Sequence, residues 1–458
     1  MKSNSPWIHQ LDKERKLAHL EADVETDVAI VGGGIAGVAT AFFILKNTDK
    51  QVLLLEGRRL GHGATGHNAG QVTSYFERSF HELVEEFGLE KAAAGQKEIE
   101  LAWELLDEIY TEASLDIPYS RFTGYAGFAN PKQVQGVLKN NFLRRQGGLK
   151  VVPILVADHI GFTSEYSDLY KLVPQQEILE KLETKNPMFI ALAETQKGVI
   201  NSALFTEKAA IYLVEKYKER FSILEEAHVG KVVLKEDHAL LDVDKFSVSA
   251  KRVVLCTNGF DKIQIFNTTG LEINTRFHHS IHGVVARMSG YLEEQTKPPA
   301  ALSYYVGPQA GLPAGEAGFA DMDDPYFYLT RREYEYNHHQ HDLICFGGPQ
   351  QALSDRAEFN PEEFDYPEAE QSSDKFIHEL YNIDLKEKIE YIYTWHGLMG
   401  YTPNGVRLVG AEPKNPVLLY NLGCNGVGIL PSIFGGKRIS QIVKGEKLLP
   451  SIFDPKDH

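Results

Sequence analysis

The chain has 458 residues, of which 43% are hydrophobic and 24% charged, as in a globular protein large enough for more than one core. Its formal net charge of −16 disfavours nonspecific binding to nucleic acid or to an anionic membrane surface. The sequence contains no run of about 18 apolar residues, the length needed to span a bilayer, and residues 1–24 lack the apolar part of a secretory signal. Three cysteines are too few for a disulfide framework, which indicates a reducing compartment. We therefore expect a cytoplasmic protein.

The first predicted elements form a strand–turn–helix–strand unit. Its two strands and its helix are expected at residues 27–31, 51–55 and 38–46. Three glycines in the first turn have the spacing G-x-G-x-x-G, namely Gly32, Gly34 and Gly37. The first permits a tight turn, the second lets the backbone approach a pyrophosphate, and the third lets the helix pack on the strand. N–H groups at the helix start, including those of Ile35 and Ala36, would face the anion.

An acidic residue follows the second strand. Glu56 lies about 20 residues beyond the glycine turn, where a carboxylate accepts hydrogen bonds from both hydroxyls of an adenosine ribose. The alternative is a glycine-rich turn that binds nothing. The combination of strand, turn, helix, strand and acid favours a dinucleotide site over that alternative.

A run of small residues comes next, at residues 60–71. It reads LGHGATGHNAGQ and combines glycine and alanine with hydrogen-bond donors. Such a run lets backbone press against a second anion or a flat ring. We therefore expect it to contact the same ligand.

The middle of the chain alternates between helices and short strands. Helices are predicted at 81–113 and 202–220, and strands at 117–129, 229–235, 238–243 and 252–256. Longer strands of a separate sheet are predicted at 273–292, 326–331 and 343–346, and the acidic segment 361–388 is expected to end in a helix. This order predicts a parallel βα core interrupted by sheet-rich insertions, with two interleaved domains.

A second glycine-rich junction lies near the end of the chain. A strand at 417–420 opens into Gly423, Asn425, Gly426 and Gly428, and a helix is expected to begin at 426–429. Two such junctions suit a ligand whose two ends each need close contact with the backbone. Adenosine diphosphate would bind at the first junction and a redox ring at the second.

The motifs together resemble the D-amino-acid-oxidase-like superfamily of FAD-dependent amine and amino-acid oxidoreductases. Within it, the chain is most similar to the gamma-glutamylputrescine-oxidase and glycine/sarcosine-oxidase branch. The residues that carry this resemblance are Gly32-x-Gly34-x-x-Gly37 with Glu56, Gly63-Ala64-Thr65-x-x-Asn68-x-Gly70-Gln71, Thr257-Asn258-Gly259, Trp395-x-Gly397 with Tyr401-Thr402-Pro403-Asn404-Gly405, and Gly423-x-Asn425-Gly426-x-Gly428. They cover both ends and the middle of the chain.

The resemblance implies an α/β fold. It consists of a Rossmann-type FAD-binding domain interleaved with an α+β substrate domain built on a mixed β-sheet. We expect the FAD-binding domain at 1–114, 198–262 and 386–458, and the substrate domain at 115–197 and 263–385. The implied FAD-binding residues are Gly32, Gly34, Ile35, Ala36, Gly37, Glu56, Gly63, Ala64, Thr65, His67, Asn68, Gly70, Gln71, Val229, Thr257, Asn258, Gly259, Gly397, Gly423, Asn425, Gly426, Val427 and Gly428.

The resemblance also implies a chemistry. A small-molecule amine or amino acid would place the C–H bond next to its neutral nitrogen against flavin N5, and a hydride would leave as the imine forms and later hydrolyses. A helix starting at 426–429 would stabilise negative charge on the reduced flavin. An unprotonated amine makes a dedicated catalytic base unnecessary.

His67 has two interpretations. In dimethylglycine-dehydrogenase-like relatives a histidine at the matching position holds the flavin covalently, so covalent attachment at His67 is one of them. The other, which we favour, is a histidine that hydrogen-bonds the cofactor or a backbone carbonyl.

Three further residues are candidates for the substrate pocket. Tyr328 and Arg331 lie in a run of tyrosines and arginines where relatives place substrate-facing residues, and an arginine could pair with a carboxylate in a bidentate fork. His396 is a candidate for the open face of the flavin. The alternative for Arg331 is a surface arginine, and the alternative for His396 is an ordinary hydrogen-bonded histidine. The histidines in 337–341, with His278 and His279, lack the ligand spacing of a metal site, so no metal is predicted.

Other functional classes fit less well. An NAD-dependent dehydrogenase gives no role to the second glycine junction. A tRNA aminomethyl-uridine-modifying enzyme would need a basic groove, which the net charge of −16 disfavours. A dehydrogenase reoxidised by an electron-transfer partner, and a flavin-binding protein without catalysis, remain alternatives.

Overall fold

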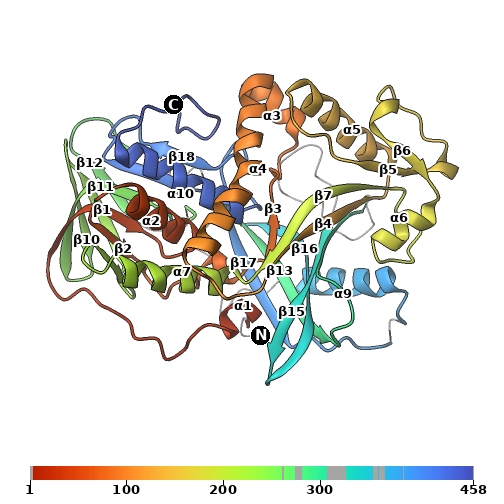
Figure 1. Cartoon of the computed structure of the whole chain (residues 1–458), viewed down its shortest axis with the longest axis horizontal. Coiled ribbons are helices and arrows are strands. Elements are labelled where there is room, and N and C mark those ends of the chain that lie inside the picture. Colours follow the sequence, from red (N-terminus) through yellow and green to blue (C-terminus); the bar gives the residue numbers. More distant parts are fainter. Residues whose placement is uncertain are drawn as a thin grey trace.

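The computed structural model describes residues 4–259, 263–273, 281–306, 326–353, 359, 367–384 and 386–456. Within these residues two β-sheets lie next to each other, one on the left and one on the right of Figure 1, with helices packed around them. Each sheet takes strands from segments far apart in the sequence. The predicted α/β fold with a second, mixed sheet is confirmed.

The first sheet has nine strands, and five of them are parallel neighbours whose carboxyl ends lie at one edge. Its strands are β1 (Val24–Val31), β2 (Val52–Leu55), β8 (Phe221–Leu224), β9 (Val229–Leu234), β10 (Ala239–Val243), β11 (Phe246–Leu255), β12 (Gln264–Asn267), β18 (Leu408–Ala411) and β19 (Leu418–Leu422). Val31, the last residue of β1, pairs with Leu55 of β2 and Leu255 of β11. Strand β8 pairs parallel with β2, and β19 pairs parallel with β11. The loops after these strands therefore meet.

Three helices pack together on this sheet. They are α2 (Ile35–Asn47), α7 (Ser202–Lys216) and α10 (Ile429–Lys444), and Figure 1 shows them side by side. All residues of α2 from Ile35 to Leu45 are buried, because the helix lies between the sheet, α7 and α10. A helix that is apolar on every side is stable only in such an enclosed position.

The second sheet has ten strands and is mostly antiparallel. Its strands are β3 (Gln71–Thr73), β4 (Tyr119–Phe128), β5 (Ile154–Ala157), β6 (Lys171–Val173), β7 (Ala191–Ile200), β13 (His282–Glu293), β14 (Ala300–Tyr305), β15 (Tyr326–Tyr336), β16 (His339–Ala352) and β17 (Tyr393–Tyr401). The helices near it are α3 (Phe80–Phe87), α4 (Leu89–Glu112), α5 (Pro131–Gln146), α6 (Gln175–Lys181) and α9 (Pro367–Tyr381).

The two faces of the second sheet have different neighbours. We call inner face the side that carries Lys197, Ser303, Tyr328, Thr330 and Trp395, which strand pairing and alternation place together. It faces the run at 60–71, because the Thr330 hydroxyl donates to the Ala69 carbonyl over 2.9 Å. On the opposite, outer face, aromatic rings form a stacked core, in which Phe327 lies 4.1 Å from Phe376 of α9 between ring centroids.

The strands of the two predicted domains lie largely in different sheets. Most strands of 1–114, 198–262 and 386–458 lie in the first sheet. Strands β3 and β17 of these segments lie in the second sheet, and β12 of the segment 263–385 lies in the first. The division into domains stays a prediction, and β3 and β17 mark where the two parts of the chain are most closely interleaved.

Residues 4–15, which we call the N-terminal arm, lie against the glycine-rich run and the second sheet. The arm contains the short helix α1 (Pro6–His9). The Asn4 N–H donates to the Thr394 carbonyl over 2.7 Å, so the arm adds a bridge to β17. Trp7 is fully buried. At the other end of the arm, the Arg15 guanidinium makes two hydrogen bonds of 2.5 and 2.7 Å to Glu225, which follows β8.

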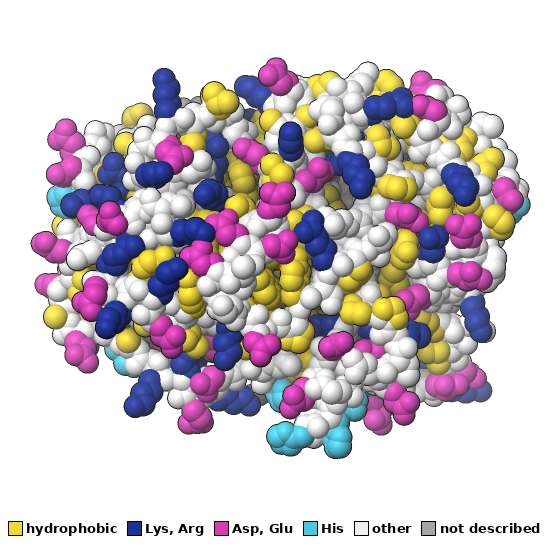
Figure 2. All heavy atoms as spheres, in the orientation of Figure 1, with side chains coloured by type: hydrophobic (Ala, Val, Ile, Leu, Met, Phe, Trp, Pro, Cys, Tyr) yellow, Lys and Arg dark blue, Asp and Glu magenta, His cyan; other side chains and the backbone are white. Residues whose placement is uncertain are grey.

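The surface carries both signs of charge. Lys and Arg side chains are interspersed with Asp and Glu over the face drawn in Figure 2. His338 is almost fully exposed in the turn between β15 and β16. In the part of the chain that the structure describes, no helix is long and apolar enough to cross a bilayer.

Candidate active site

The loops at the carboxyl edge of the first sheet bring the predicted motifs together. Gly32 follows β1, Glu56 follows β2, Thr257 comes shortly after β11, and Gly423 follows β19. Because these strands are parallel neighbours, the loops converge although they lie up to about 390 residues apart in the sequence. Ligands of open parallel sheets bind at this edge.

The first glycine turn has the geometry of a pyrophosphate cradle. Gly32 has a φ of +110°, and a Cβ there would lie 2.7 Å from the Cys256 carbonyl oxygen, so only glycine fits. A Cβ at Gly34 would lie 2.9 Å from Thr65 Oγ1, and the Ile35 N–H donates to the same oxygen over 3.0 Å. Gly37 packs directly on Gly32. Helix α2 starts at Ile35, so its first N–H groups, including that of Ala36, lie at this cradle.

Glu56 is held in place by the backbone on both sides. Its Oε2 accepts from the Gly33 N–H over 2.6 Å and its Oε1 from the Arg58 N–H over 2.8 Å. Burial raises the pKa of its carboxyl group. The Ala227 N–H donates to the Glu56 carbonyl over 2.9 Å, which brings the start of β9, at Val229, beside this loop. The arrangement fits the predicted adenosine end of the site.

The run at 63–71 is fixed by Asn68. The Asn68 amide donates to the Thr65 carbonyl over 2.8 Å and to the Ser202 hydroxyl over 2.7 Å, and its oxygen accepts from the Gly70 N–H over 2.7 Å. Residues from Ala64 to Gly66 form a short 3-10 turn after Gly63, and Gln71 starts β3. The run is therefore a rigid loop, held by its own side chains and by α7.

His67 lies in this loop with one ring nitrogen engaged. Its Nδ1 is 2.9 Å from the Gly63 carbonyl, so Nδ1 carries the proton. Burial lowers the pKa of the imidazole, which favours the neutral ring. This hydrogen bond is the one that the favoured interpretation allows, and non-covalent binding of the flavin stays the prediction.

Strand β17 supports the same loop from the second sheet. A Cβ at Gly397 would clash with the His67 carbonyl oxygen, so the predicted glycine is needed for a close backbone approach. The indole N–H groups of Trp395 and Trp7 both donate to the Asn68 carbonyl, over 3.2 and 2.5 Å. The predicted Trp395-x-Gly397 motif and the N-terminal arm thus hold one loop.

The second glycine junction is joined to the middle of the chain. Asn258 Oδ1 accepts from the Cys424 N–H over 2.9 Å, which connects the turn at Thr257–Gly259 to the turn before α10. The Asn425 N–H donates to the Gly400 carbonyl over 2.9 Å. Helix α10 starts at Ile429, after Gly426, Val427 and Gly428, in close agreement with the predicted start. Its first N–H groups lie at this turn, as a flavin ring would require.

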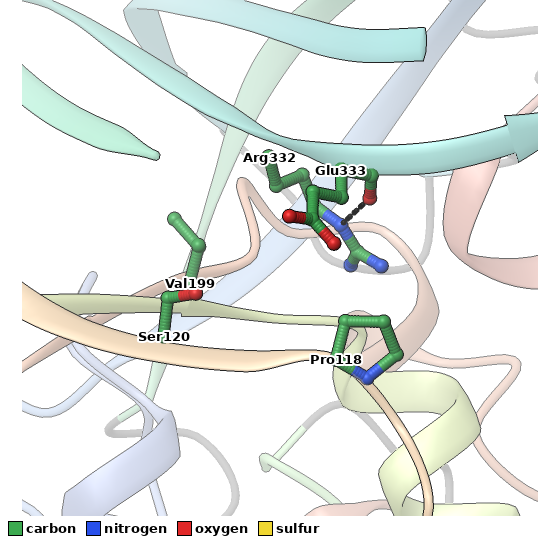
Figure 3. A pocket seen from close by; sticks show the side chains of 5 residues that line it. All are labelled: Pro118, Ser120, Val199, Arg332 and Glu333. Atoms are coloured by element: carbon green, nitrogen blue, oxygen red, sulfur yellow. Dashed lines mark hydrogen bonds between the residues drawn. The ribbon is translucent and has the colours of Figure 1, made fainter. Parts of the chain in front are cut away.

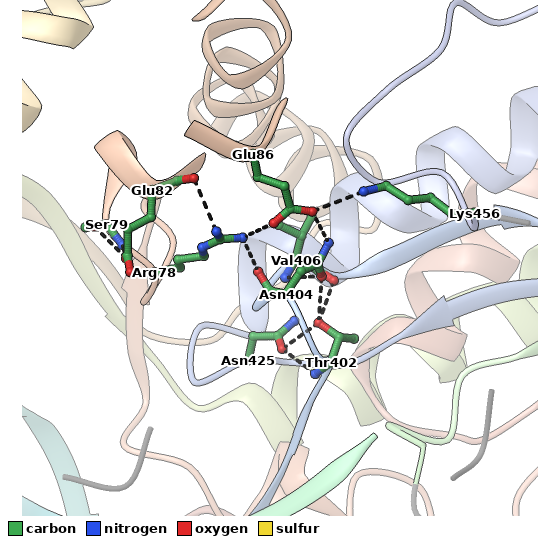
Figure 4. A network of polar contacts seen from close by, with 9 residues as sticks. All are labelled: Arg78, Ser79, Glu82, Glu86, Thr402, Asn404, Val406, Asn425 and Lys456. Carbon is green, nitrogen blue, oxygen red and sulfur yellow. Dashed lines mark hydrogen bonds and ion pairs between the residues drawn. The ribbon is translucent and has the colours of Figure 1, made fainter. Parts of the chain in front are cut away.

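A polar network holds this junction from outside (Figure 4). The Thr402 N–H donates to Asn425 Oδ1 over 2.8 Å, and Arg78 binds Glu86 and donates to the Asn404 carbonyl over 2.9 Å. Lys456 Nζ lies 3.0 Å from Glu86. Although burial alone would raise the pKa of Glu86, the hydrogen bonds of these cations hold it below its usual value. The Tyr401–Gly405 motif is therefore a support for the glycine junction.

The three predicted substrate residues lie in different places. Tyr328 is on the inner face, and burial together with the charge of Glu77 raises the pKa of its hydroxyl, so the phenol stays neutral. Arg331 is on the outer face, where Nη1 and Nη2 bind Glu183 over 2.7 and 2.6 Å. Alternation also places His396 opposite Trp395, on the outer face. Of the three, only Tyr328 lies toward the candidate cofactor site, and the Glu183 pairing favours a structural role for Arg331.

Sequence reasoning did not single out the charged groups beside Tyr328. Glu77 is 8% exposed, and a Cβ at Gly426 would lie 2.5 Å from its carboxyl carbon, so its carboxylate lies against the second glycine junction. Lys197 is 1% exposed on the inner face. The sequence offered no clear signal, because Lys197 ends a run of four polar residues, 194–197, inside the strand 191–200.

Among the residues that the structure describes, no three His, Cys, Asp or Glu side chains are grouped closely enough to hold a metal ion. His278 and His279 lie outside the described residues.

Solved structures share the fold of this chain. Glycine oxidase from Geobacillus kaustophilus has a TM-score of 0.68 at 16% identity, with 95% of this chain and 99% of that chain covered. L-amino acid deaminase from Proteus vulgaris has a TM-score of 0.65 at 13% identity, with 96% and 98% covered. At these identities the comparison establishes the fold.

Curated relatives match over shorter stretches. Gamma-glutamylputrescine oxidoreductase of Escherichia coli is 29% identical over 90 residues, which is 20% of this chain and 21% of that protein. A putative Rieske 2Fe-2S iron-sulfur protein of Bacillus subtilis is 30% identical over 118 residues, 26% of this chain and 23% of that protein. The alignments thus span less than a quarter of either relative.

The family described as FAD dependent oxidoreductase matches residues 27–442. That range contains the glycine cradle, Glu56, the rigid loop and the second glycine junction. The predicted resemblance and the predicted FAD cofactor are thereby confirmed. With these residues arranged at one edge of a parallel sheet, the chain belongs to the FAD-dependent oxidoreductase family.

Proposed function

We propose that this enzyme oxidises the C–N bond of a primary or secondary amine or of an amino acid. The observation that carries the proposal is the convergence of both glycine junctions below the inner face of the second sheet, with Tyr328 on that face. The names of the relatives support it, since they include a glycine oxidase, an L-amino acid deaminase and a gamma-glutamylputrescine oxidoreductase.

When bound, FAD would supply the acceptor for the hydride that leaves the carbon next to the substrate nitrogen. The residues of this chain would bind and position. Gly32, Gly34 and the start of α2 would hold the pyrophosphate, and Glu56 the ribose. The start of α10 would place N–H groups and a positive helix end beside the ring. Tyr328 would limit the space above the ring and offer a neutral hydroxyl to the substrate.

The buried surroundings favour an uncharged amine in the reaction. The phenols of Tyr328 and Tyr401 have pKa values raised by burial, so they would act as neutral hydrogen-bonding groups in the physiological range. Tyr401 and Trp395 are fully buried, so they would help to keep water from a bound substrate. Loss of the hydride from carbon would then yield an imine, which hydrolyses after release.

The test is an anaerobic titration of the purified yellow protein. Glycine, sarcosine, dimethylglycine, D-alanine, proline and gamma-glutamylputrescine would be added in turn while flavin absorbance is followed. Bleaching by one of them is the expected result and would identify the substrate class. Recovery of the absorbance in air would indicate dioxygen as acceptor, whereas recovery only with an electron-transfer mediator would indicate a dehydrogenase. Bound flavin that none of the amines bleaches would contradict the proposal.

We also propose a cytoplasmic location. Its support is chemical: the free thiols Cys256 and Cys345 are buried and Cys424 is partly buried. A protein that keeps its cysteines reduced fits a reducing compartment.

A further inference from the structure

Lys197 crosses the inner face of the second sheet. Its side chain starts on β7 and passes over β4 at Gly124, where a Cβ would lie 2.5 Å from Lys197 Cδ. Its Nζ ends on β14, 2.9 Å from the Ser303 hydroxyl and 3.5 Å from the Tyr125 carbonyl. Ser303 pairs directly with Tyr328 of β15. The absence of a side chain at Gly124 thus lets the ammonium group reach the strand next to Tyr328.

The ammonium group has no counter-ion within the described residues. No carboxylate lies within ion-pair distance of Lys197 among them, and burial, unopposed by any neighbouring negative charge, lowers its pKa to about 7. Taking an ammonium out of water is costly unless an anion or several hydrogen bonds compensate. The Ser303 hydroxyl and one long contact leave part of its donor capacity unused. Within the described part of the chain, no carboxylate therefore pairs with this ammonium group.

Other polar groups surround this ammonium on the same face. Thr73 is directly opposite Lys197, Thr195 is two residues before it, and Gln71 is two residues before Thr73. Gln71 Oε1 and Thr195 Oγ1 are buried and have no hydrogen-bond partner among the described residues. The Tyr75 hydroxyl contacts the side chains of Gln71, Thr73 and Ser303. Buried polar atoms without partners indicate that a polar ligand group belongs there.

The inner face contains a second buried cation, Arg332, whose surroundings differ from those of Lys197. Its guanidinium lies 5.1 Å from the Trp7 ring and lines a small cavity with Pro118, Ser120, Val199 and Glu333 (Figure 3). Burial lowers the pKa of this guanidinium; Cys345, Tyr334 and Tyr110 oppose that shift more than Glu333 does. Arg332 Nη1 is also buried without a hydrogen-bond partner among the described residues, but the guanidinium is packed against Trp7 of the N-terminal arm. For Lys197, no acidic group in the described part of the chain opposes the effect of burial.

We propose that Lys197 binds the carboxylate of the substrate, so that the substrate is an amino acid and not a plain amine. This inference rests on the proposed amine oxidation. The carboxylate would take the unused donors of Lys197 and accept from Thr195, while Gln71 Oε1 would accept from the substrate nitrogen. The charges would then balance inside the sheet. An alkylamine without a carboxylate would leave the ammonium unpaired and would bind less well.

The test measures binding of two isosteric probes to the holoenzyme, acetate and acetamide. Their dissociation constants would be measured by perturbation of the flavin spectrum and, independently, by calorimetry. The variants are Lys197→Met and Lys197→Arg, with Lys181→Met as control, because Lys181 is partly exposed and already paired with Glu194. We expect Lys197→Met to weaken acetate binding by about tenfold or more and to leave acetamide unchanged. Lys197→Arg should retain acetate, and the control should match the wild type.

The pH dependence gives a second readout. The titratable groups that face this site are Tyr75, Glu77, Tyr305 and Tyr328, and burial raises the pKa of all three tyrosines, so they remain neutral up to pH 9. Acetate affinity in the wild type should therefore fall as the pH rises through about 7, where free Lys197 loses its proton. In Lys197→Arg the affinity should stay level to pH 9, because arginine remains protonated.

The inference would be overturned by acetate binding that survives in Lys197→Met, by equal weakening of acetate and acetamide, or by a wild type that does not bind acetate. Flavin content and thermal unfolding of each variant would show that the protein is folded. The proposed function fails differently, through a flavin that no amine bleaches. If methylamine and glycine bleach the flavin equally well, amine oxidation stands and the role of Lys197 is wrong.

Discussion

At the residue scale, the buried Lys197 makes the stability of the protein depend on pH. In the unfolded chain lysine keeps its proton up to about pH 10.5, whereas in the folded protein the pKa is about 7. Unfolding between these values takes up a proton, so the free energy of unfolding should rise with pH from 7 to 10. The contribution of this single group is at most on the order of 5 kcal/mol.

Denaturant unfolding of the wild type and of Lys197→Met at a series of pH values measures this contribution. Methionine fills a similar volume without charge, so the variant should be more stable at pH 7 and should lack that part of the pH dependence. The control is Lys181→Met, which removes a partly exposed lysine paired with Glu194. If the free energy of unfolding changes with pH in the same way in the wild type and in Lys197→Met, the cost of burying the ammonium group is offset by other interactions in the folded protein.

Gly397 provides a second prediction at this scale. The change Gly397→Ala would push a methyl group into the His67 carbonyl and displace the loop at 63–71. Overpacking of this kind costs about 1–3 kcal/mol, so FAD should bind roughly tenfold more weakly while the sheet still forms. Fluorescence titration of the flavin-free protein with FAD measures the change. Gly136→Ala is the control, since nothing lies within 4 Å of that position in α5, and it should leave FAD affinity unchanged.

At the scale of elements, we expect the N-terminal arm to slow the dissociation of FAD, because it holds the loop at 63–71 in place. Trp7→Phe removes one of the two indole donors to the Asn68 carbonyl. A net hydrogen-bond loss of about 1 kcal/mol corresponds to roughly fivefold faster FAD dissociation. The matched control is Trp103→Phe. Trp103 is equally buried, but its indole N–H has no hydrogen-bond partner among the described residues. Equal dissociation rates in both variants would contradict a role for the arm.

The same scale shows what the sequence could predict. The unit β1–α2–β2 spans 24–55 against a predicted 27–55, because a strand, a glycine turn and an apolar helix are specified by residues close in sequence. The face on which Arg331 lies was not accessible in this way. It depends on strand register and on Glu183, which is 148 residues away. Lys197 was missed for the same reason, because the position of its ammonium group depends on Gly124 and Ser303, which lie on other strands.

The structure also explains why the N-terminal arm was not predicted. Trp7, Ile8 and Leu11 stand among charged residues without a helical or strand period. Trp7 and Leu11 are nevertheless buried, because Gly66 and Gly70 leave room for Ile8 and the Trp7 ring. Contacts between residues some 60 positions apart leave no periodic signal in either segment.

At the scale of the whole molecule, FAD should stabilise both sheets together. The loop at 63–71 bonds to α7 on the first sheet and to β15 and β17 on the second. A ligand that holds this loop acts on both. Removal of FAD should lower the Tm. Added FAD should raise the free energy of unfolding with the logarithm of its concentration, by about 2.7 kcal/mol at one hundred times Kd, and the Tm with it. Calorimetry of the holoenzyme should give one transition, and two separate transitions, only one of them sensitive to FAD, would contradict this coupling.

The position of the N-terminal arm has a consequence for the order of assembly during synthesis. Residues 4–15 are synthesised long before β15 and β17, yet Asn4 bonds to Thr394 and Tyr334 bonds to the Pro6 carbonyl. The arm cannot dock until nearly 400 residues have been made. Tight retention of FAD is therefore a late event, and nascent chains that stop before β17 would release it readily.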